Sequence, residues 1–242
     1  MRDNQSGNVL FYIFIAVGLL AALSYVVAQS GRGGVGNISA ERAAIYASEI
    51  IEYGNIVSQA TDQLRLRGYS DTQISFENSV VAGYVNANCT EVGCELFDVA
   101  GGAVNYMTPK AEWLDSDQSA QLRYGEIYFH GETSAIDVGT SGDDLIMFVP
   151  YLKKEVCEAV NSRLGIDPVN RDVPLEVNGP FVGNVLFTGA YGSVLDRKVS
   201  GDATTGETDI LYGKYAGCTE SPGGGSLPPA GTYHYFQVLL AR

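Results

Sequence analysis

The sequence is poor in basic residues, histidine and tryptophan. Its 242 residues contain 15 Lys and Arg against 28 Asp and Glu, which gives a formal net charge of −13, and only two His and one Trp. Nucleic-acid phosphates need clustered Lys and Arg, so this charge argues against nucleic acid as a partner. It also opposes docking onto an anionic membrane surface. We attribute the acidity to a soluble, self-repelling exterior.

The motifs of the common catalytic sites are also missing. The sequence has no G-x-S-x-G, no H-E-x-x-H, no phosphate-binding P-loop and no dinucleotide fingerprint. His130 and His234 lie in alternating, strand-like segments, and we interpret them as surface or cross-strand residues rather than as bases. Glu126 and Glu132 flank His130, but paired carboxylates act only in a cleft and at a defined separation. The sequence predicts neither an enzyme nor a cofactor.

The sequence has four cysteines, all of them after residue 88: Cys89, Cys94, Cys157 and Cys218. An even number in a domain with export features favours two disulfides. Three pairings are possible, and the short spacing favours Cys89 with Cys94, which leaves Cys157 for Cys218. The C-x2-C or His spacing of a zinc site is absent.

Two acidic loops contain the residue types of a calcium site. Residues 137–144 (DVGTSGDD) and 196–209 combine carboxylates with glycine, and the candidate ligands are Asp137, Asp143 and Asp144. The spacing is not that of an EF-hand. Because turns between strands also favour Asp and Gly, the sequence does not establish a metal site.

One long apolar run dominates the N-terminal region. Val9–Ala28 contains no charged residue, and about 20 such residues match the thickness of a bilayer core. The favoured interpretation is a retained anchor or a helix that packs into a helical assembly. A cleaved secretory signal ending before Gln29 is the second possibility. A buried core helix is the third, and it fits poorly because the run is apolar all round.

The following segments suggest a break and then an amphipathic helix. GRGGVGN contains four glycines, so we expect a helix to loosen there. Small and apolar residues then recur every three or four positions, which predicts one helix face, and Gly68 is placed to end the helix. The residues of this stripe are Ala43, Ala47, Ile50, Gly54, Val57, Thr61 and Leu64.

Beyond Gly68 the pattern changes to strands and turns. Segments rich in β-branched and aromatic residues are bounded by Gly, Asn, Asp or Pro. A helix is expected from Pro150 to Gly165, with Leu152, Val156, Val160 and Leu164 on one face. The expected strands are residues 73–77, 80–85, 103–107, 126–130, 145–149, 183–188, 209–215 and 233–240.

The predicted fold class is α+β. We expect a long N-terminal helix, with an apolar half, a Gly-rich break and an amphipathic half, packed on a mostly antiparallel β head with one further helix. The expected segments are a leader at 1–7, a transmembrane or filament-core helix at 8–30, a hinge at 31–38, an amphipathic helix at 39–68 and the head at 69–242.

This layout resembles that of type IV pilins and pseudopilins. The resemblance covers about residues 1–67: a short polar leader that ends in Gly7, an uncharged helix that starts at Asn8, and its amphipathic continuation. It implies that a prepilin peptidase cuts between Gly7 and Asn8, with methylation of the new N-terminus, and that the apolar helices form a filament core. Family members carry Glu at the fifth mature residue, where this chain has Tyr12.

The sequence therefore predicts a pilin-like structural subunit that associates with itself or with other pilin-like subunits. The expected location is a bacterial inner membrane, contacted through Val9–Ala28 with the head in the periplasm, or a filament at the cell surface. The alternative is a single-span or secreted surface-binding domain, similar in role to an adhesin, that acts without assembly. A tethered hydrolase is the third class, and the sequence offers no nucleophile and base for it.

Overall fold

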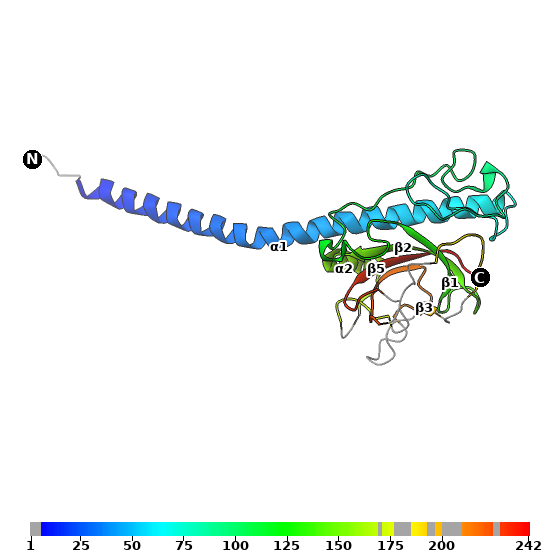
Figure 1. Ribbon diagram of the computed structural model, residues 1–242. Helices are drawn as coiled ribbons and strands as arrows, with labels where there is room; N and C mark the ends of the chain where they lie inside the picture. Colours follow the sequence, from blue (N-terminus) through cyan, green and yellow to red (C-terminus); the bar gives the residue numbers. More distant parts are fainter. Residues whose placement is uncertain (1–5, 169–170, 177–184, 193–196, 200–209, 225–227) are drawn as a thin grey trace, which may run out of the picture. The chain divides into compact units, whose positions relative to one another are not determined.

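The computed structural model describes residues 6–168, 171–176, 185–192, 197–199, 210–224 and 228–242. Within these ranges, the side chains of residues 6–10, 25–38 and 197 are not described. The chain forms two compact units, Met1–Arg42 and Ala43–Arg242, which we treat separately. Helix α1 (Ser6–Leu66) contributes to both of them (Figure 1).

The predicted fold class is wrong in how it divides and places the N-terminal helix. Residues 31–38 are helical, so the Gly-rich break is absent from α1. Glycine lowers helix propensity by about 1 kcal/mol per residue, but it has no steric barrier to helical backbone angles. In the first unit the described side chains are those of two short segments, residues 11–24 and 39–42, and neither belongs to the second unit, which contains the head. The structure therefore has no two-part helix packed on the head.

In the second unit, α1 from Ala43 onward supplies one wall of the core. All seven residues of the predicted stripe are buried, which confirms the amphipathic pattern. The helix ends as expected, because Gly68 has a φ of 100° and donates its amide to the Arg65 carbonyl. Glycine reaches this left-handed conformation without the cost that a Cβ would add.

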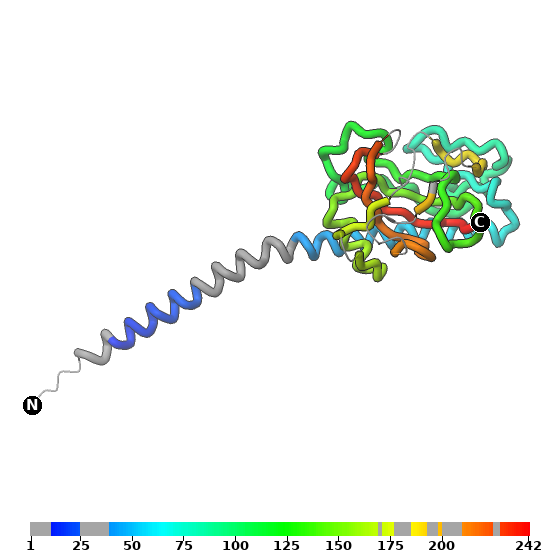
Figure 2. The backbone as a smooth tube through the Cα atoms, turned by 90° about the horizontal axis from the view of Figure 1, so that it is seen from below, coloured from blue at the N-terminus to red at the C-terminus, as the bar shows by residue number. Residues whose placement is uncertain are grey.

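The strands form a five-stranded sheet with the order β3-β1-β2-β5-β4. All neighbours are antiparallel except β1 and β3, which are parallel. In Figure 2, β5 runs through the middle of the second unit. The strands are β1 (Tyr128–Ala135), β2 (Asp144–Leu152), β3 (Arg197–Val199), β4 (Ala216–Glu220) and β5 (Tyr233–Leu240).

The two faces of the sheet belong to two separate apolar clusters. Met147 and Tyr235 join the cluster that contains the α1 stripe. Ile146 and Phe236, their neighbours along β2 and β5, join a second cluster on the opposite face. Alternate side chains of a strand point to opposite faces. Because both faces are covered, every residue of β2 is buried.

At Gly54, α1 approaches the β5 strand too closely for a side chain. A Cβ at this position would lie 2.7 Å from Tyr235 Oη and 3.1 Å from Gln237 Oε1. We expect Gly54→Ala to lower the free energy of unfolding by about 2 kcal/mol, because overpacking outweighs the gain in helix propensity. Urea unfolding measures the change. Gly18→Ala is the matched control, since a Cβ there has no atom within 4 Å; an equal loss in both variants would contradict this account.

Helix α2 (Lys154–Leu164) is joined to the sheet covalently. Cys157 is bonded to Cys218 of β4, and Asn161 bonds the backbone amide and carbonyl of Cys218 at 2.8 and 2.9 Å. The predicted start at Pro150 is wrong, because Pro150 and Leu152 belong to β2. Proline cannot donate to a strand ladder, and the β2–β5 register is interrupted between Val149 and Leu152.

Several expected strands are absent from the described chain. Residues 73–77, 80–85 and 103–107 are irregular, apart from one isolated bridge between Ser75 and Glu95. Residues 185–188 are irregular and 210–213 form a turn, while 183–184 and 209 lie outside the described residues. Side chains satisfy part of this backbone: Asn86 Nδ2 donates to the carbonyls of Thr72 and Ile74. Such bonds compete with strand pairing.

Two short 3-10 helices also lie between α1 and β1. They are η1 (Val92–Cys94) and η2 (Ser116–Gln118). Residues 126–130 were expected to form a strand, and β1 confirms one that starts two residues later and runs to Ala135. The strands expected at 145–149 and 233–240 correspond to β2 and β5.

Candidate functional site

The first unit exposes a concentration of large apolar side chains. Nine of them, between residues 11 and 24, have exposed fractions of 44–69%. They are Phe11, Tyr12, Ile13, Phe14, Ile15, Val17, Leu19, Leu20 and Leu23. Among the residues that the structure describes, no helix has a segment of the length and apolarity that crossing a membrane requires.

The predicted processing site lies at the start of α1. Gly7 and Asn8 follow Ser6, the first residue of the helix, and their side chains are not described. The rest of the predicted leader, residues 1–5, lies outside the described residues. Cleavage between Gly7 and Asn8 stays a prediction.

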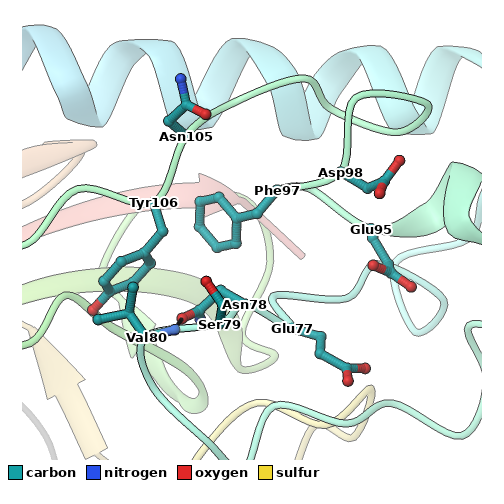
Figure 3. A pocket seen from close by; sticks show the side chains of 9 residues that line it. All are labelled: Glu77, Asn78, Ser79, Val80, Glu95, Phe97, Asp98, Asn105 and Tyr106. Atoms are coloured by element: carbon teal, nitrogen blue, oxygen red, sulfur yellow. Dashed lines mark hydrogen bonds between the residues drawn. The ribbon is translucent and has the colours of Figure 1, made fainter.

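The second unit contains a cleft of about 540 Å³ that is lined by Glu77, Glu95 and Asp98, and we call it the acidic cleft. Figure 3 shows Glu77, Glu95 and Asp98 on one side, Tyr106 on the other and the Phe97 ring between them. The remaining lining residues are Asn78, Ser79, Val80 and Asn105.

Packing and turns hold the walls of the acidic cleft. The Phe97 ring lies 5.4 Å from the Tyr106 ring and 5.8 Å from Phe129 in the core. Tyr106 Oη accepts the Ile127 amide at 2.8 Å and lies 3.1 Å from the Ile127 carbonyl. Asn78 Oδ1 accepts two backbone amides, those of residues 80 and 81. The aromatic wall formed by Phe97 and Tyr106 is therefore anchored to the core, and the loop that contains Asn78 is fixed by a turn.

The electrostatics of the acidic cleft are those of uncompensated negative charge. Partial burial, and then the nearby charges of Glu77 and Asp98, raise the pKa of Glu95. None of the ion pairs found in the described part of the chain involves any of these three carboxylates. Chemically, the cleft can accept hydrogen bonds from a cationic group and lay it beside an aromatic ring.

The candidate calcium ligands are not brought together. Asp144 is fully buried, and its carboxylate accepts the amides of Ala135 at 2.7 Å and Arg242 at 2.8 Å. Asp137 lines a separate pocket of about 380 Å³ together with Lys198. Over the described residues, no group of three or more His, Cys, Asp or Glu is placed to hold a metal ion. Asp143 precedes Asp144 and helps to raise its pKa.

Both histidines are buried, so the surface interpretation of them is wrong. His130 of β1 pairs with Ile146 across the sheet, and His234 of β5 pairs with Thr219. Cross-strand placement is therefore correct for both. Glu126 forms an ion pair with Arg123 at 2.9 Å.

The cysteines pair as their spacing favours. Cys89 is bonded to Cys94, and Cys157 to Cys218. Sequence reasoning missed the acidic cleft, because Glu77 lies 18 and 21 positions before Glu95 and Asp98, in segments expected to be strands and loops. No spacing rule connects such positions.

Comparison with protein-family models, with curated proteins and with solved structures finds no match to the chain.

Proposed function

We propose that this chain is a pilin-like structural subunit, which acts by packing its apolar N-terminal helix segment against other subunits. The observation that carries the proposal is the exposure of nine large apolar side chains at residues 11–24. Burying one such side chain stabilises a protein by about 1.5–3 kcal/mol, so covering nine contributes on the order of 10 kcal/mol or more. Contiguous apolar surface of this kind marks an interaction site.

Several sequence features support the same proposal. The uncharged run Val9–Ala28 follows a polar leader that ends in Gly7, and the two disulfides suit an oxidising location such as the periplasm or the cell surface. Before assembly, the apolar segment is held in the inner membrane, and a prepilin peptidase processes the leader. The protein has no catalytic role in this proposal.

A charge placed in the apolar segment tests the proposal. We expect the full chain in mild detergent to form oligomers, and Leu19→Glu to shift them to monomers, because a buried unpaired carboxylate opposes association. Size exclusion with light scattering measures the mass. Val99→Glu, on the head, is the matched control: Val99 is 89% exposed, and we expect unchanged oligomers.

The outcomes also separate the alternatives. A wild-type protein that is monomeric at every concentration would favour the second candidate, a surface-binding domain that acts alone. Intact mass of protein from native membranes tests the processing step. A chain that starts at Asn8 agrees with the proposal, a start at Gln29 removes the apolar segment, and an intact Met1 leaves a plain anchor.

A further inference from the structure

The two disulfides differ in their exposure to solvent. Cys157 and Cys218 have exposed fractions of 0%, and that of Cys94 is 1%. Cys89 is partly exposed, which makes it the one half-cystine that a dissolved thiol can approach. Thiol–disulfide exchange requires a thiolate to reach a disulfide sulfur. The Cys89–Cys94 bond is therefore open to reduction in the folded protein, whereas Cys157–Cys218 is shielded.

The Cys89–Cys94 bond closes a short loop that contacts Tyr69, three residues after the end of α1. The bonded cysteines are five positions apart, and Thr90, Glu91 and Val92 between them are exposed. Tyr69 Oη donates to Glu91 Oε1 at 3.0 Å, and the Tyr69 ring lies directly against Gly93. Few buried apolar contacts hold this loop, so the covalent bond carries much of its order.

The same loop leads directly into the wall of the acidic cleft. The Cys94 carbonyl accepts the Ser75 amide at 3.0 Å, and the Leu96 amide donates to the Ser75 carbonyl at 2.8 Å. Glu95 lies between these two bonds, and Phe97 and Asp98 follow it into the cleft. The position of Cys94 therefore sets where this wall begins.

Repulsion acts on this wall from inside the cleft. Partial burial raises the pKa of Glu95, and the nearby charges of Glu77 and Asp98 raise it further. Like charges at short range favour separation. Phe97 stays packed on Phe129, so release of the covalent bond loosens the start of this wall, and repulsion then favours movement of Glu95 away from Glu77.

We propose that the Cys89–Cys94 disulfide is a redox clamp that holds the Glu95–Asp98 wall of the acidic cleft in place, and that Cys157–Cys218 is a permanent structural bond. The clamp responds to a dithiol reductant. One thiolate of the reductant attacks Cys89 Sγ, the S–S bond breaks, and Cys94 leaves as a thiolate that takes up a proton. The second thiol then attacks the mixed disulfide, which releases Cys89 as a thiol and leaves the reductant as a disulfide.

Stepwise reduction of the full chain tests the clamp. The protein is treated with increasing dithiothreitol, free thiols are captured with N-ethylmaleimide, and peptide mass spectrometry locates them. We expect Cys89 and Cys94 to be labelled at least tenfold faster than Cys157 and Cys218. In that partly reduced protein, amide hydrogen exchange of residues 88–98 should rise at least threefold, with the β2 and β5 amides unchanged.

Variants provide an independent readout. A Cys89→Ser, Cys94→Ser double variant should show the same faster exchange at 95–98 without reductant, whereas Val92→Ser, which keeps the bond in the same loop, should not. Labelling of all four cysteines together would overturn the proposal, because reduction would then follow global unfolding. Selective reduction with unchanged exchange at 95–98 would also overturn it, since the bond would not hold the wall.

Discussion

Replacing both Cys157 and Cys218 by alanine should lower the free energy of unfolding by about 4 kcal/mol. The bond joins residues 61 positions apart, α2 to β4. Cross-linking so long a segment removes many conformations from the unfolded chain, and this entropy loss is the main source of stabilisation. For a protein of this size the expected fall in melting temperature is about 10 °C.

The short disulfide provides the matched control. Cys89 and Cys94 are five positions apart, so the same replacement there should cost about 2 kcal/mol. Urea unfolding of the two double variants, followed by circular dichroism, compares them directly. An equal loss in both would show that loop length does not govern the stabilisation and that local packing does.

Replacing His234 by glutamine should remove a strong pH dependence of stability between about pH 6.5 and pH 3. The imidazole is fully buried, and its Nδ1 accepts the Tyr151 amide at 3.2 Å, where the β2–β5 ladder is interrupted. Nε2 lies 2.8 Å from Thr232 Oγ1, which donates to the Pro229 carbonyl at 2.7 Å. Burial lowers the pKa of His234 from 6.5 to about 3.

The direction of this pH dependence follows from the difference in proton binding between the unfolded and the folded state. The unfolded chain protonates His234 below pH 6.5, whereas the folded protein does so only near pH 3. The contribution of His234 to the free energy of unfolding is therefore complete above pH 6.5. It falls by about 1.4 kcal/mol for each pH unit below that value, and by roughly 5 kcal/mol in total.

Asp144 should act in the opposite direction. Its burial raises its pKa from 3.8 to about 6, so the folded protein binds this proton more tightly than the unfolded chain does. The stability that Asp144 contributes is complete below pH 3.8 and is lost as the pH rises through about 6. Between pH 4 and 6 the slopes of the two groups oppose each other.

The two variants should therefore diverge from the wild type in opposite senses. Unfolding by urea at pH 4, 5, 6 and 7 gives the slopes. Relative to the wild type, His234→Gln should gain stability as the pH falls, and Asp144→Asn should lose it. We also expect His234→Gln to be about 1–3 kcal/mol less stable at pH 7, because glutamine reproduces the buried bonds imperfectly. Parallel curves for all three proteins would contradict the assigned pKa shifts.

Local patterns in the sequence predicted some elements well. The stripe from Ala43 to Leu64 is buried because spacings of three and four place residues on one helix face, whatever the rest of the fold does. Gly68 ends α1 because the requirement for a left-handed residue at a helix end is local as well. The short spacing of Cys89 and Cys94 likewise made their pairing predictable.

Other expectations failed where strand or helix propensity competes with side-chain bonds to the backbone or with the sheet register. Residues 73–77 and 80–85 have strand-like composition. The side chains of Asn78 and Asn86, rather than a neighbouring strand, bond backbone groups of these segments. Pro150 looked like a helix start, but the register interruption between β2 and β5 accommodates it within a strand. The Gly-rich stretch at 31–38 lowers helix propensity without forbidding the helical angles that it adopts.

The sequence by itself determined the apolar N-terminal run, the absence of catalytic motifs, the buried face of α1 and the favoured disulfide pairing, because each depends on composition or on residues close in the chain. Only the tertiary structure decided the acidic cleft, the burial of His130 and His234, and the inward carboxylate of Asp144. These depend on segments far apart in sequence that the packing of the sheet and α1 brings together, and no local pattern records which segments will meet.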